Sequence, residues 1–561
     1  MSKRIRALAT LAPLALAIGC AAAPTAPDRP AYGTGGTPRI FEGMGPHARR
    51  VTTTSAEAQA YFDQGLAWAY SFNHDEAVRS FTRAAELDPR CAMAWWGVSY
   101  AQGPNYNDAA MSRQRSEAAW AALEKARAEI DDESAIERAL VEALAHRYAS
   151  PPAPKDRAAL DAAFAKAMAE VYSRFPGDAD VGTLFAESMM VQHPWKLYGC
   201  DKKPARDETN TIVAVLEKAL AAEPTHPGAN HLYIHAVETS GELDRGIAAA
   251  DRLSGLVPGS GHMEHMPSHI YVQVGMWERS IEQNVKATKR DAAYRKLSPD
   301  QGRQNLYMTH NAHMLAFSAM MVGREKLATE AARTMWDDLP EQALRDYGPF
   351  FEKKFCSIYD VPKRFGRWDT ILAEPAPPEF MPTATALWRA HRAIAFAAKQ
   401  DFQHALLEHA AFRAARNAIP ENPLWDTYEN VMKFLDVSDL FIEGEIALQR
   451  GKWEEAARIL EDAAALEDAL GYGEPPSYMQ PVRHTLGAVY LKLGRHADAE
   501  RVYREDLAKW RDNGWSLYGL GRALEGQGKR AEAAAVRKEF ERVWAGADEP
   551  TATSCKCILE T

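Results

Sequence analysis

The stretch RHTLGAVYLKLGRHADAERVYREDL, residues 483–507, decides the fold of this chain. Its apolar residues recur at spacings of three and four, which places them on one face of a helix, and it lacks the alternation typical of a strand. Gly494 is the turn residue between two such helices. The following stretch repeats the pattern, and Gly528 comes 34 residues after Gly494. The sequence therefore predicts a repeated pair of helices.

This unit resembles the tetratricopeptide repeat (TPR), whose period is 34 residues. Gly487 lies where the family has small residues for helix contact, and Tyr503 lies where it has large packing residues. Residues 61–89 form a similar unit, although Phe72 replaces the usual turn glycine. The resemblance implies an all-α fold, a right-handed superhelical solenoid of TPR-like helix pairs with a concave groove on one face.

Length and composition agree with an extended array. The chain has 561 residues, of which 46% are hydrophobic and 25% charged, and this is too long for one compact core. The formal net charge is −10, and an acidic chain repels the phosphates that supply most nucleic-acid affinity. We therefore expect no nucleic-acid partner.

The N-terminus predicts export. Residues 1–19 combine a basic start with an apolar run too short to span a bilayer, as a signal peptide does. The run ends in LAIGC, which resembles the lipobox of bacterial lipoproteins and implies lipidation of Cys20; plain secretion is the alternative. We expect a protein of the cell envelope, in the periplasm and lipid-anchored to the outer membrane, with no other membrane contact.

The repeat pattern changes along the mature chain. Residues 20–50 are rich in Ala, Pro and Gly and predict a flexible tether. The predicted domains are then an N-terminal TPR-like array with a histidine-rich groove (51–330), irregular helical repeats (331–436), a C-terminal TPR array (437–547) and a flexible cysteine-containing tail (548–561). In that tail, the spacing of Cys555 and Cys557 suits either a soft metal ion or a local disulfide.

Histidines concentrate in the predicted groove. In the family, the first helix of each pair lines the groove, and positions about thirteen, ten and six residues before the turn glycine point into it. Counting back from Gly241, Gly275 and Gly323 gives nine positions, and seven of them are histidine although the chain has 17 histidines in all. They are His231, His235, His262, His265, His269, His310 and His313.

This recurrence predicts a transition-metal site. Imidazole suits copper, zinc and iron, and two histidines one helical turn apart can hold one ion together with a neighbouring helix. Seven histidines exceed one coordination shell, so we expect two or more ions, or histidines that act as acids and bases. Pro267 is tolerated only in a first helical turn, which predicts that its helix starts late, after His262 and His265.

Whether the protein is an enzyme stays open at this point. In a metalloenzyme the ions would activate water or dioxygen, with Glu187 as the candidate ligand or general base. The alternative is a TPR scaffold that binds a peptide or protein partner at the cell envelope without catalysis. Partly protonated imidazoles could also hold an acidic peptide, and a purely structural role is the third interpretation.

Overall fold

The computed structural model describes residues 30–130, 134–151, 156–298, 301–337, 339–420, 431–476, 478–548 and 553–558. Over these residues the fold is helical throughout, without a β-strand; two isolated bridges join Asn105 to Asp108 and Tyr198 to Pro204. The chain is an all-α solenoid, which confirms the predicted fold class. The predicted signal peptide and Cys20 lie outside the described residues.

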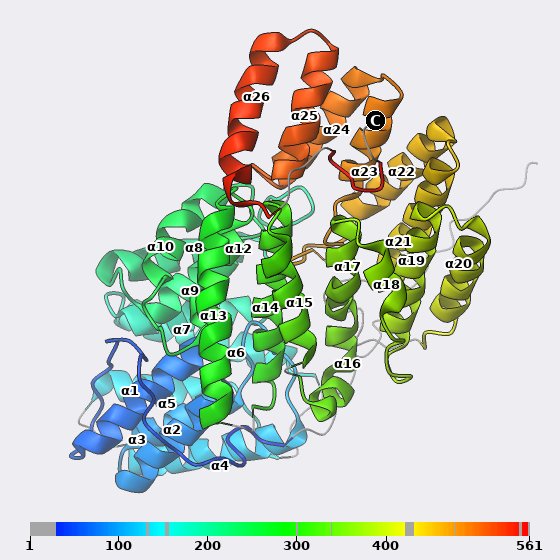
Figure 1. Cartoon of the computed structure of the whole chain (residues 1–561). Helices are drawn as coiled ribbons and strands as arrows, with labels where there is room; N and C mark the ends of the chain where they lie inside the picture. Colours follow the sequence, from blue (N-terminus) through cyan, green and yellow to red (C-terminus); the bar gives the residue numbers. More distant parts are fainter. Residues whose placement is uncertain are drawn as a thin grey trace, which may run out of the picture.

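The helices follow one another in antiparallel pairs, from the N-terminal array in blue to α26 in red (Figure 1). Those of the first half are α1 (Ala56–Tyr70), α2 (His74–Leu87), α3 (Ala92–Gln102), α4 (Arg113–Glu129), α5 (Ala135–Ala145), α6 (Ala158–Arg174), α7 (Ala179–Met190), α8 (Asp207–Ala222), α9 (Pro227–Val237), η1 (Leu243–Gly246), α10 (Ile247–Leu253), α11 (Gly261–His265), α12 (Ser268–Tyr271), α13 (Trp277–Leu297) and α14 (Gln304–Met321). Those of the second half are α15 (Glu325–Asp337), α16 (Glu341–Phe355), α17 (Ser357–Arg364), α18 (Trp368–Ala373), α19 (Pro382–Ala398), α20 (Phe402–Asn417), α21 (Val431–Gln449), α22 (Trp453–Asp468), α23 (Val482–Lys492), α24 (His496–Lys509), α25 (Gly514–Gly526), α26 (Arg530–Val543) and η2 (Trp544–Gly546).

Left-handed residues make the turns inside the pairs. Gly275 (φ 80°) and Gly323 (φ 73°) adopt this conformation, as predicted for turn glycines, whereas Gly241 does not. Phe72 adopts it too (φ 55°), at the position where the family has glycine. A bulky residue there is strained by about 1–3 kcal/mol, so the Phe72 ring must contribute something that glycine cannot.

The N-terminal superhelix curls tightly enough to bring distant helices together. The end of α1 contacts α9, and the Tyr70 carbonyl lies 2.6 Å from Nδ1 of His231. Just beyond, Asn73 donates a hydrogen bond to Tyr294 of α13 at 3.1 Å. The concave face is therefore closed over at this place: six of the seven predicted groove histidines lie buried in the interior and His310 is half-buried, instead of lining an open groove.

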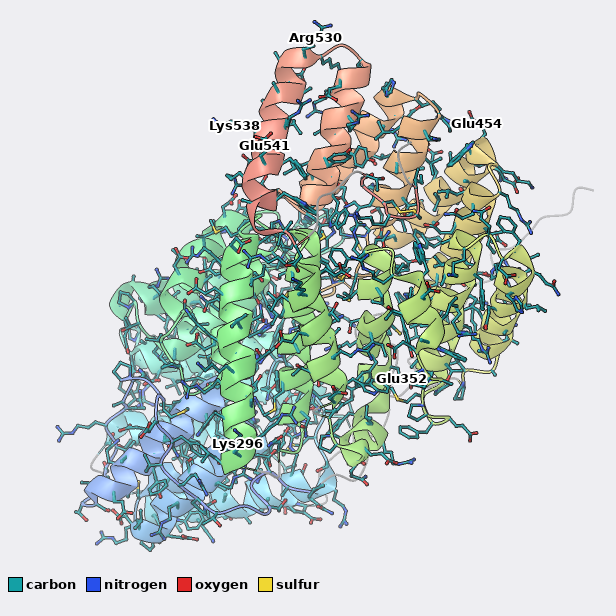
Figure 2. The ribbon with its side chains drawn as sticks, in the orientation of Figure 1. Lys296, Glu352, Glu454, Arg530, Lys538 and Glu541 are labelled. Atoms are coloured by element: carbon teal, nitrogen blue, oxygen red, sulfur yellow. A yellow bond between two sulfur atoms is a disulfide. The ribbon has the colours of Figure 1, made fainter. Side chains whose placement is uncertain are left out.

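The C-terminal array is attached to the middle of the molecule by long-range contacts. Trp277 donates to the carbonyl of Arg511 at 2.9 Å, and Trp515 donates to the carbonyl of Met320 at 2.7 Å. Charged side chains such as those of Arg530, Lys538 and Glu541 project outward from α26 (Figure 2). Among the described residues, no helix combines the length and the apolar character that crossing a membrane requires.

Two predicted flexible segments are packed instead. Residues 30–50, the described part of the predicted tether, cross the N-terminal helices; Gly33 donates to Asp75 at 3.0 Å, and the Gly43 carbonyl accepts from Gly259 at 2.7 Å. Residues 553–558 of the predicted tail return to the C-terminal array, where Cys555 is 3% exposed. Both segments pack for the same reason: their polar backbone groups form hydrogen bonds with residues distant in sequence.

Candidate metal centre

Four helices, α9, α11, α12 and α14, carry the histidines inward. His231 and His235 lie one turn apart on α9, and both are fully buried. The next segment is broken at Pro267, which has no N–H to continue the hydrogen-bond ladder of α11. The predicted late start is wrong, since Ser260 caps a helix that begins at Gly261 and already carries His262.

The first triad consists of His231, His235 and His262, each offering one ring nitrogen within 4.8 Å of the other two. The Nε2 atoms of His231 and His262 lie 3.2 Å apart. Nδ1 of His231 faces the Tyr70 carbonyl, and Nδ1 of His235 lies 2.6 Å from Glu238 Oε1. Both rings therefore carry their proton on Nδ1, and both Nε2 atoms hold a lone pair.

The second triad consists of His265, His269 and His310, again within 4.8 Å of one another. Nε2 of His269 lies 2.7 Å from Nε2 of His265 and 3.3 Å from Nε2 of His310. Nδ1 of His265 faces the Asn284 side-chain oxygen at 2.6 Å, and Nδ1 of His269 faces Glu238 Oε2 at 2.6 Å. These partners again place protons on Nδ1 and direct lone pairs inward.

The spacing of these nitrogens suits a shared ion. A tetrahedral ion with bonds of about 2.0–2.1 Å to imidazole sets its nitrogen ligands about 3.3 Å apart. The 3.2 Å and 3.3 Å separations match that value, and the 2.7 Å separation of His265 and His269 is shorter. Nε2 of His235 is buried with no hydrogen-bond partner, an arrangement that normally costs about 1–3 kcal/mol. A cation in each triad would satisfy these nitrogens.

Two carboxylates contact triad histidines, and one of them, Glu238, connects the two triads; sequence reasoning missed both. Glu238, one turn after His235, accepts hydrogen bonds from His235 of the first triad and His269 of the second. Glu474 lies 3.0 Å from Nδ1 of His269 and comes from the loop between α22 and α23. Tyr472 of the same loop donates to Glu474 at 2.7 Å. Carboxylates that hold the distal nitrogen of a histidine are the usual outer partners of metal ligands.

Burial keeps most of these imidazoles neutral. It lowers the pKa of His231, His262, His265 and His310 well below the usual range, with the neighbouring imidazoles adding to the effect, and it lowers the pKa of His235 to about 3. His269 differs, because Glu474 and Glu238 outweigh its burial and raise its pKa to about 10. Neutral imidazole is the form that binds metals, so protons compete little for the first triad.

Aromatic rings enclose the first triad. The Phe72 ring centre lies 4.5 Å from that of His231, and it stacks on His235 at 5.9 Å. Tyr106 and Trp195 pack against His235 at 5.3 Å and 5.4 Å, and Trp195 comes from the segment between α7 and α8. The packing of Phe72 explains its strained backbone, because a glycine could not cover the histidines.

The remaining predicted residues lie apart from the triads. His313 is buried one turn beyond His310 on α14, its Nδ1 has no hydrogen-bond partner, and burial together with Lys354 lowers its pKa to about 3. Glu187, the predicted catalytic carboxylate, is hydrogen-bonded to Tyr100, and burial raises its pKa. Among the described residues, the carboxylates paired with triad histidines are thus Glu238 and Glu474.

A third histidine cluster has a different character. His226 accepts from the Ala229 backbone N–H through Nδ1, so its Nε2 carries the proton and donates to Asp180 at 3.0 Å. His47 lies between Asp180 and Glu223, at 3.1 Å and 3.0 Å. Its pKa is raised, because hydrogen bonds and attraction from both carboxylates outweigh burial. Each ring nitrogen of His47 and His226 has a hydrogen-bond partner, either a carboxylate oxygen that accepts or the Ala229 N–H that donates. The cluster therefore needs protons only and no metal ion.

Comparisons with known proteins support the repeat. Residues 480–505 and 514–538 match the family described as tetratricopeptide repeat. No curated protein matches the sequence. Similar solved structures include a human IFIT1 dimer with m7Gppp-AAAA (12% identity, 88% of this chain and 92% of that chain, TM-score 0.32), the APC/C hetero-tetramer Cut9-Hcn1 (12%, 88% and 74%, 0.29) and yeast Tom70 (11%, 87% and 93%, 0.24). The family match identifies tetratricopeptide repeats in the C-terminal array.

Proposed function

We propose that this protein binds two transition-metal ions, one in each histidine triad. The observation that carries the proposal is the orientation of four buried imidazoles: His231, His235, His265 and His269 each turn Nδ1 toward an oxygen and leave Nε2 directed inward. Three imidazoles suit copper, zinc or iron, and in the second triad the ion must first displace the proton of His269. They also leave a fourth position open, as catalytic zinc sites do, so a metalloenzyme is compatible with this centre.

Elemental analysis of the full chain, produced without a histidine tag, tests the proposal. We expect about two equivalents of metal in the wild type, because each triad supplies one complete set of three nitrogen ligands. The double variant His231→Ala/His235→Ala should lose one equivalent, and His265→Ala/His269→Ala should lose the other. A wild type that holds no metal after reconstitution would contradict the proposal.

The third histidine cluster supplies a matched control. His47→Gln/His226→Gln also removes two buried, clustered imidazoles from the N-terminal half. Because protons satisfy that cluster, this variant should keep both equivalents. An equal loss of metal in this variant would show that the triads are not the site.

A second candidate function rests on the tetratricopeptide units at residues 480–538, which form a surface of the kind that TPR proteins use for peptide or protein partners. In this proposal the metal centre stabilises the scaffold. Partner binding by the variants that lose metal distinguishes the two candidate functions. If these variants still bind the partner, the metal centre has a function separate from the scaffold.

We also propose that the protein is exported and anchored to a membrane by a lipid. The sequence of residues 1–20 supports this proposal, with Cys20 as the lipidated residue and the periplasmic face of the outer membrane as the location. Cys20→Ala should release the protein from the membrane fraction of an expressing bacterium. Retention of that variant in the membrane fraction would contradict the anchor.

A further inference from the structure

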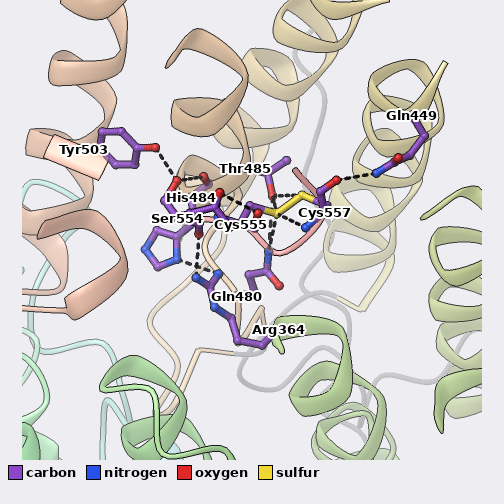
Figure 3. Close-up of a disulfide and its surroundings, with 10 residues drawn as sticks. Arg364, Gln449, Gln480, His484, Thr485, Tyr503, Ser554, Cys555 and Cys557 are labelled. Atoms are coloured by element: carbon purple, nitrogen blue, oxygen red, sulfur yellow. Dashed lines mark hydrogen bonds between the residues drawn. A yellow bond between two sulfur atoms is a disulfide. The ribbon is translucent and has the colours of Figure 1, made fainter. Parts of the chain in front are cut away.

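The C-terminal tail is seated inside the C-terminal array. Residues 553–558 lie against α17, α21, α23 and α24 (Figure 3). Arg364 donates to the Ser554 carbonyl at 2.7 Å, Tyr503 lies 2.5 Å from the Ser554 hydroxyl, and Gln449 donates to the Cys557 carbonyl at 2.8 Å. Partners from several helices therefore fix the position of the two tail cysteines.

Cys555 and Cys557 form a disulfide, and hydrogen-bond donors surround its buried sulfur. Thr485 Oγ1 lies 3.3 Å from Sγ of Cys555, the backbone N–H of Cys557 lies 3.4 Å away, and Gln480 Nε2 lies 3.9 Å away. A disulfide sulfur is a weak acceptor, whereas donors of this kind stabilise a thiolate. The surroundings thus favour the charged form that appears only after reduction.

A carboxylate faces the same sulfurs. Glu445 of α21 is 2% exposed, and it offers an oxygen within 4.8 Å of both cysteine sulfurs. Its Oε2 atom is buried without a hydrogen-bond partner. Burial raises the pKa of Glu445 to about 7. A buried, unpartnered carboxylate oxygen is unfavourable by itself, and this one lies beside two potential thiolates.

We propose that reduction of the Cys555–Cys557 disulfide creates a zinc-binding site made by the two thiolates and Glu445. A small dithiol supplies two electrons and two protons: its own sulfurs join in a disulfide, the Cys555–Cys557 bond breaks, and each sulfur takes one proton. Zn²⁺ then displaces both protons to solvent. This site is separate from the histidine triads.

The ligand set selects the metal. Thiolates favour zinc and Cu(I), and the carboxylate oxygen favours zinc, which accepts sulfur and oxygen ligands together. The Cα atoms of the two cysteines lie 5.3 Å apart, so both side chains can reach one ion from the same turn of the tail. Three protein ligands leave a fourth position to water.

A cobalt titration of the full chain tests this proposal, because Co²⁺ replaces zinc and thiolate ligands alone give it an intense near-ultraviolet charge-transfer band. Histidine and carboxylate ligands do not, so the triads contribute nothing to this signal. The protein is titrated as isolated and after anaerobic treatment with dithiothreitol followed by removal of the reductant. We expect the band to appear in the reduced protein as Co²⁺ is added, with an intensity that corresponds to one thiolate-bound ion per chain, and to be absent from the oxidised one.

Variants assign the ligands. Cys555→Ser/Cys557→Ser should abolish the band, and Glu445→Gln should weaken the apparent Co²⁺ affinity at least about tenfold. Cys200→Ser, which removes an exposed free cysteine, should leave the titration unchanged. Helical circular dichroism verifies that each variant is folded. A reduced wild type without the band, an unchanged Glu445→Gln titration or a loss of the band in Cys200→Ser would overturn the proposal.

Discussion

The Nε2 atoms of His265 and His269 lie 2.7 Å apart in the interior, while Nδ1 of each ring faces an oxygen. Since those oxygens hold the Nδ1 protons, two lone pairs would point at each other unless a cation lies between them. In the second triad a proton can serve as the cation between the two lone pairs, because the pKa of His269 is about 10. In the first triad the pKa of His235 is about 3, so a metal ion is the better partner for its nitrogen.

Glu238 should control both metal sites. Glu238→Gln removes the charge that orients His235 and His269, and loss of such an outer partner typically weakens metal binding about 10–100-fold. Competition with a chromophoric chelator measures the affinity. Glu264→Gln is the matched control, because this buried carboxylate lies on α11 beside His265 but interacts with Lys286 and Arg290. Equal weakening by both variants would contradict the assignment.

Phe72 should act as a cover of the first triad. Phe72→Gly relieves the left-handed strain but removes a buried ring, for a net loss of about 2–4 kcal/mol in the free energy of unfolding. We expect one equivalent of metal to leave faster in a stopped-flow chelation experiment. Gln400→Gly, at an exposed residue with φ 64°, should leave the chelation rate unchanged. An unaltered rate in Phe72→Gly would exclude the covering role.

Metal removal should destabilise the fold. A ligand that binds only the native state adds about 4 kcal/mol per site when its free concentration is 1,000 times its Kd. Treatment with a chelator should therefore lower the midpoint of thermal unfolding. His265→Ala/His269→Ala should show a smaller decrease, since one site is already lost. A midpoint insensitive to chelator in the metal-loaded wild type would show that the ions do not bind the folded interior.

Asp360 should make stability depend on pH. Burial raises the pKa of Asp360, but the attraction of Lys363 and His391, each 3.0 Å away, outweighs it and lowers the pKa. Because the folded-state pKa lies below the unfolded value of about 3.9, the stabilisation is present above that pH and is lost as pH falls toward the folded-state pKa.

Urea unfolding of wild type and Asp360→Asn between pH 7 and pH 3 measures this contribution. At pH 7 the variant should lose about 3–5 kcal/mol, because Lys363 stays buried without its partner. The difference between the two proteins should shrink toward pH 3. A difference that is constant over this range would contradict the ion-pair assignment.

The repeat pattern allowed most of the histidines in the two triads to be predicted from the sequence. His265 and His269 follow His231 and His235 by 34 residues, the period of the repeat, and six of the seven predicted histidines form the two triads. Glu238 was within reach of the same reasoning, because it lies one helical turn after His235. Glu474 was not, since it comes from a loop outside the repeat pattern, and only the packing of the C-terminal array brings it to His269.

The conformations of the tail and of the helix broken at Pro267 could not be predicted from the repeat pattern. Composition predicts a flexible segment around Cys555, because it contains few large apolar residues, yet its stability here comes from hydrogen bonds to Arg364 and Thr485. Pro267 was expected to delay its helix, but the proline instead occupies a break between two short helices. Both outcomes depend on partners distant in sequence.

The most direct measurement is an anomalous difference map from crystals of the full chain loaded with zinc or copper. We expect two peaks, one amid the nitrogens of His231, His235 and His262 and one amid those of His265, His269 and His310, each about 2.0–2.1 Å from its ligands. Peaks at the His47–His226 cluster alone, or no peak at either triad in crystals shown to contain the metal, would contradict this expectation.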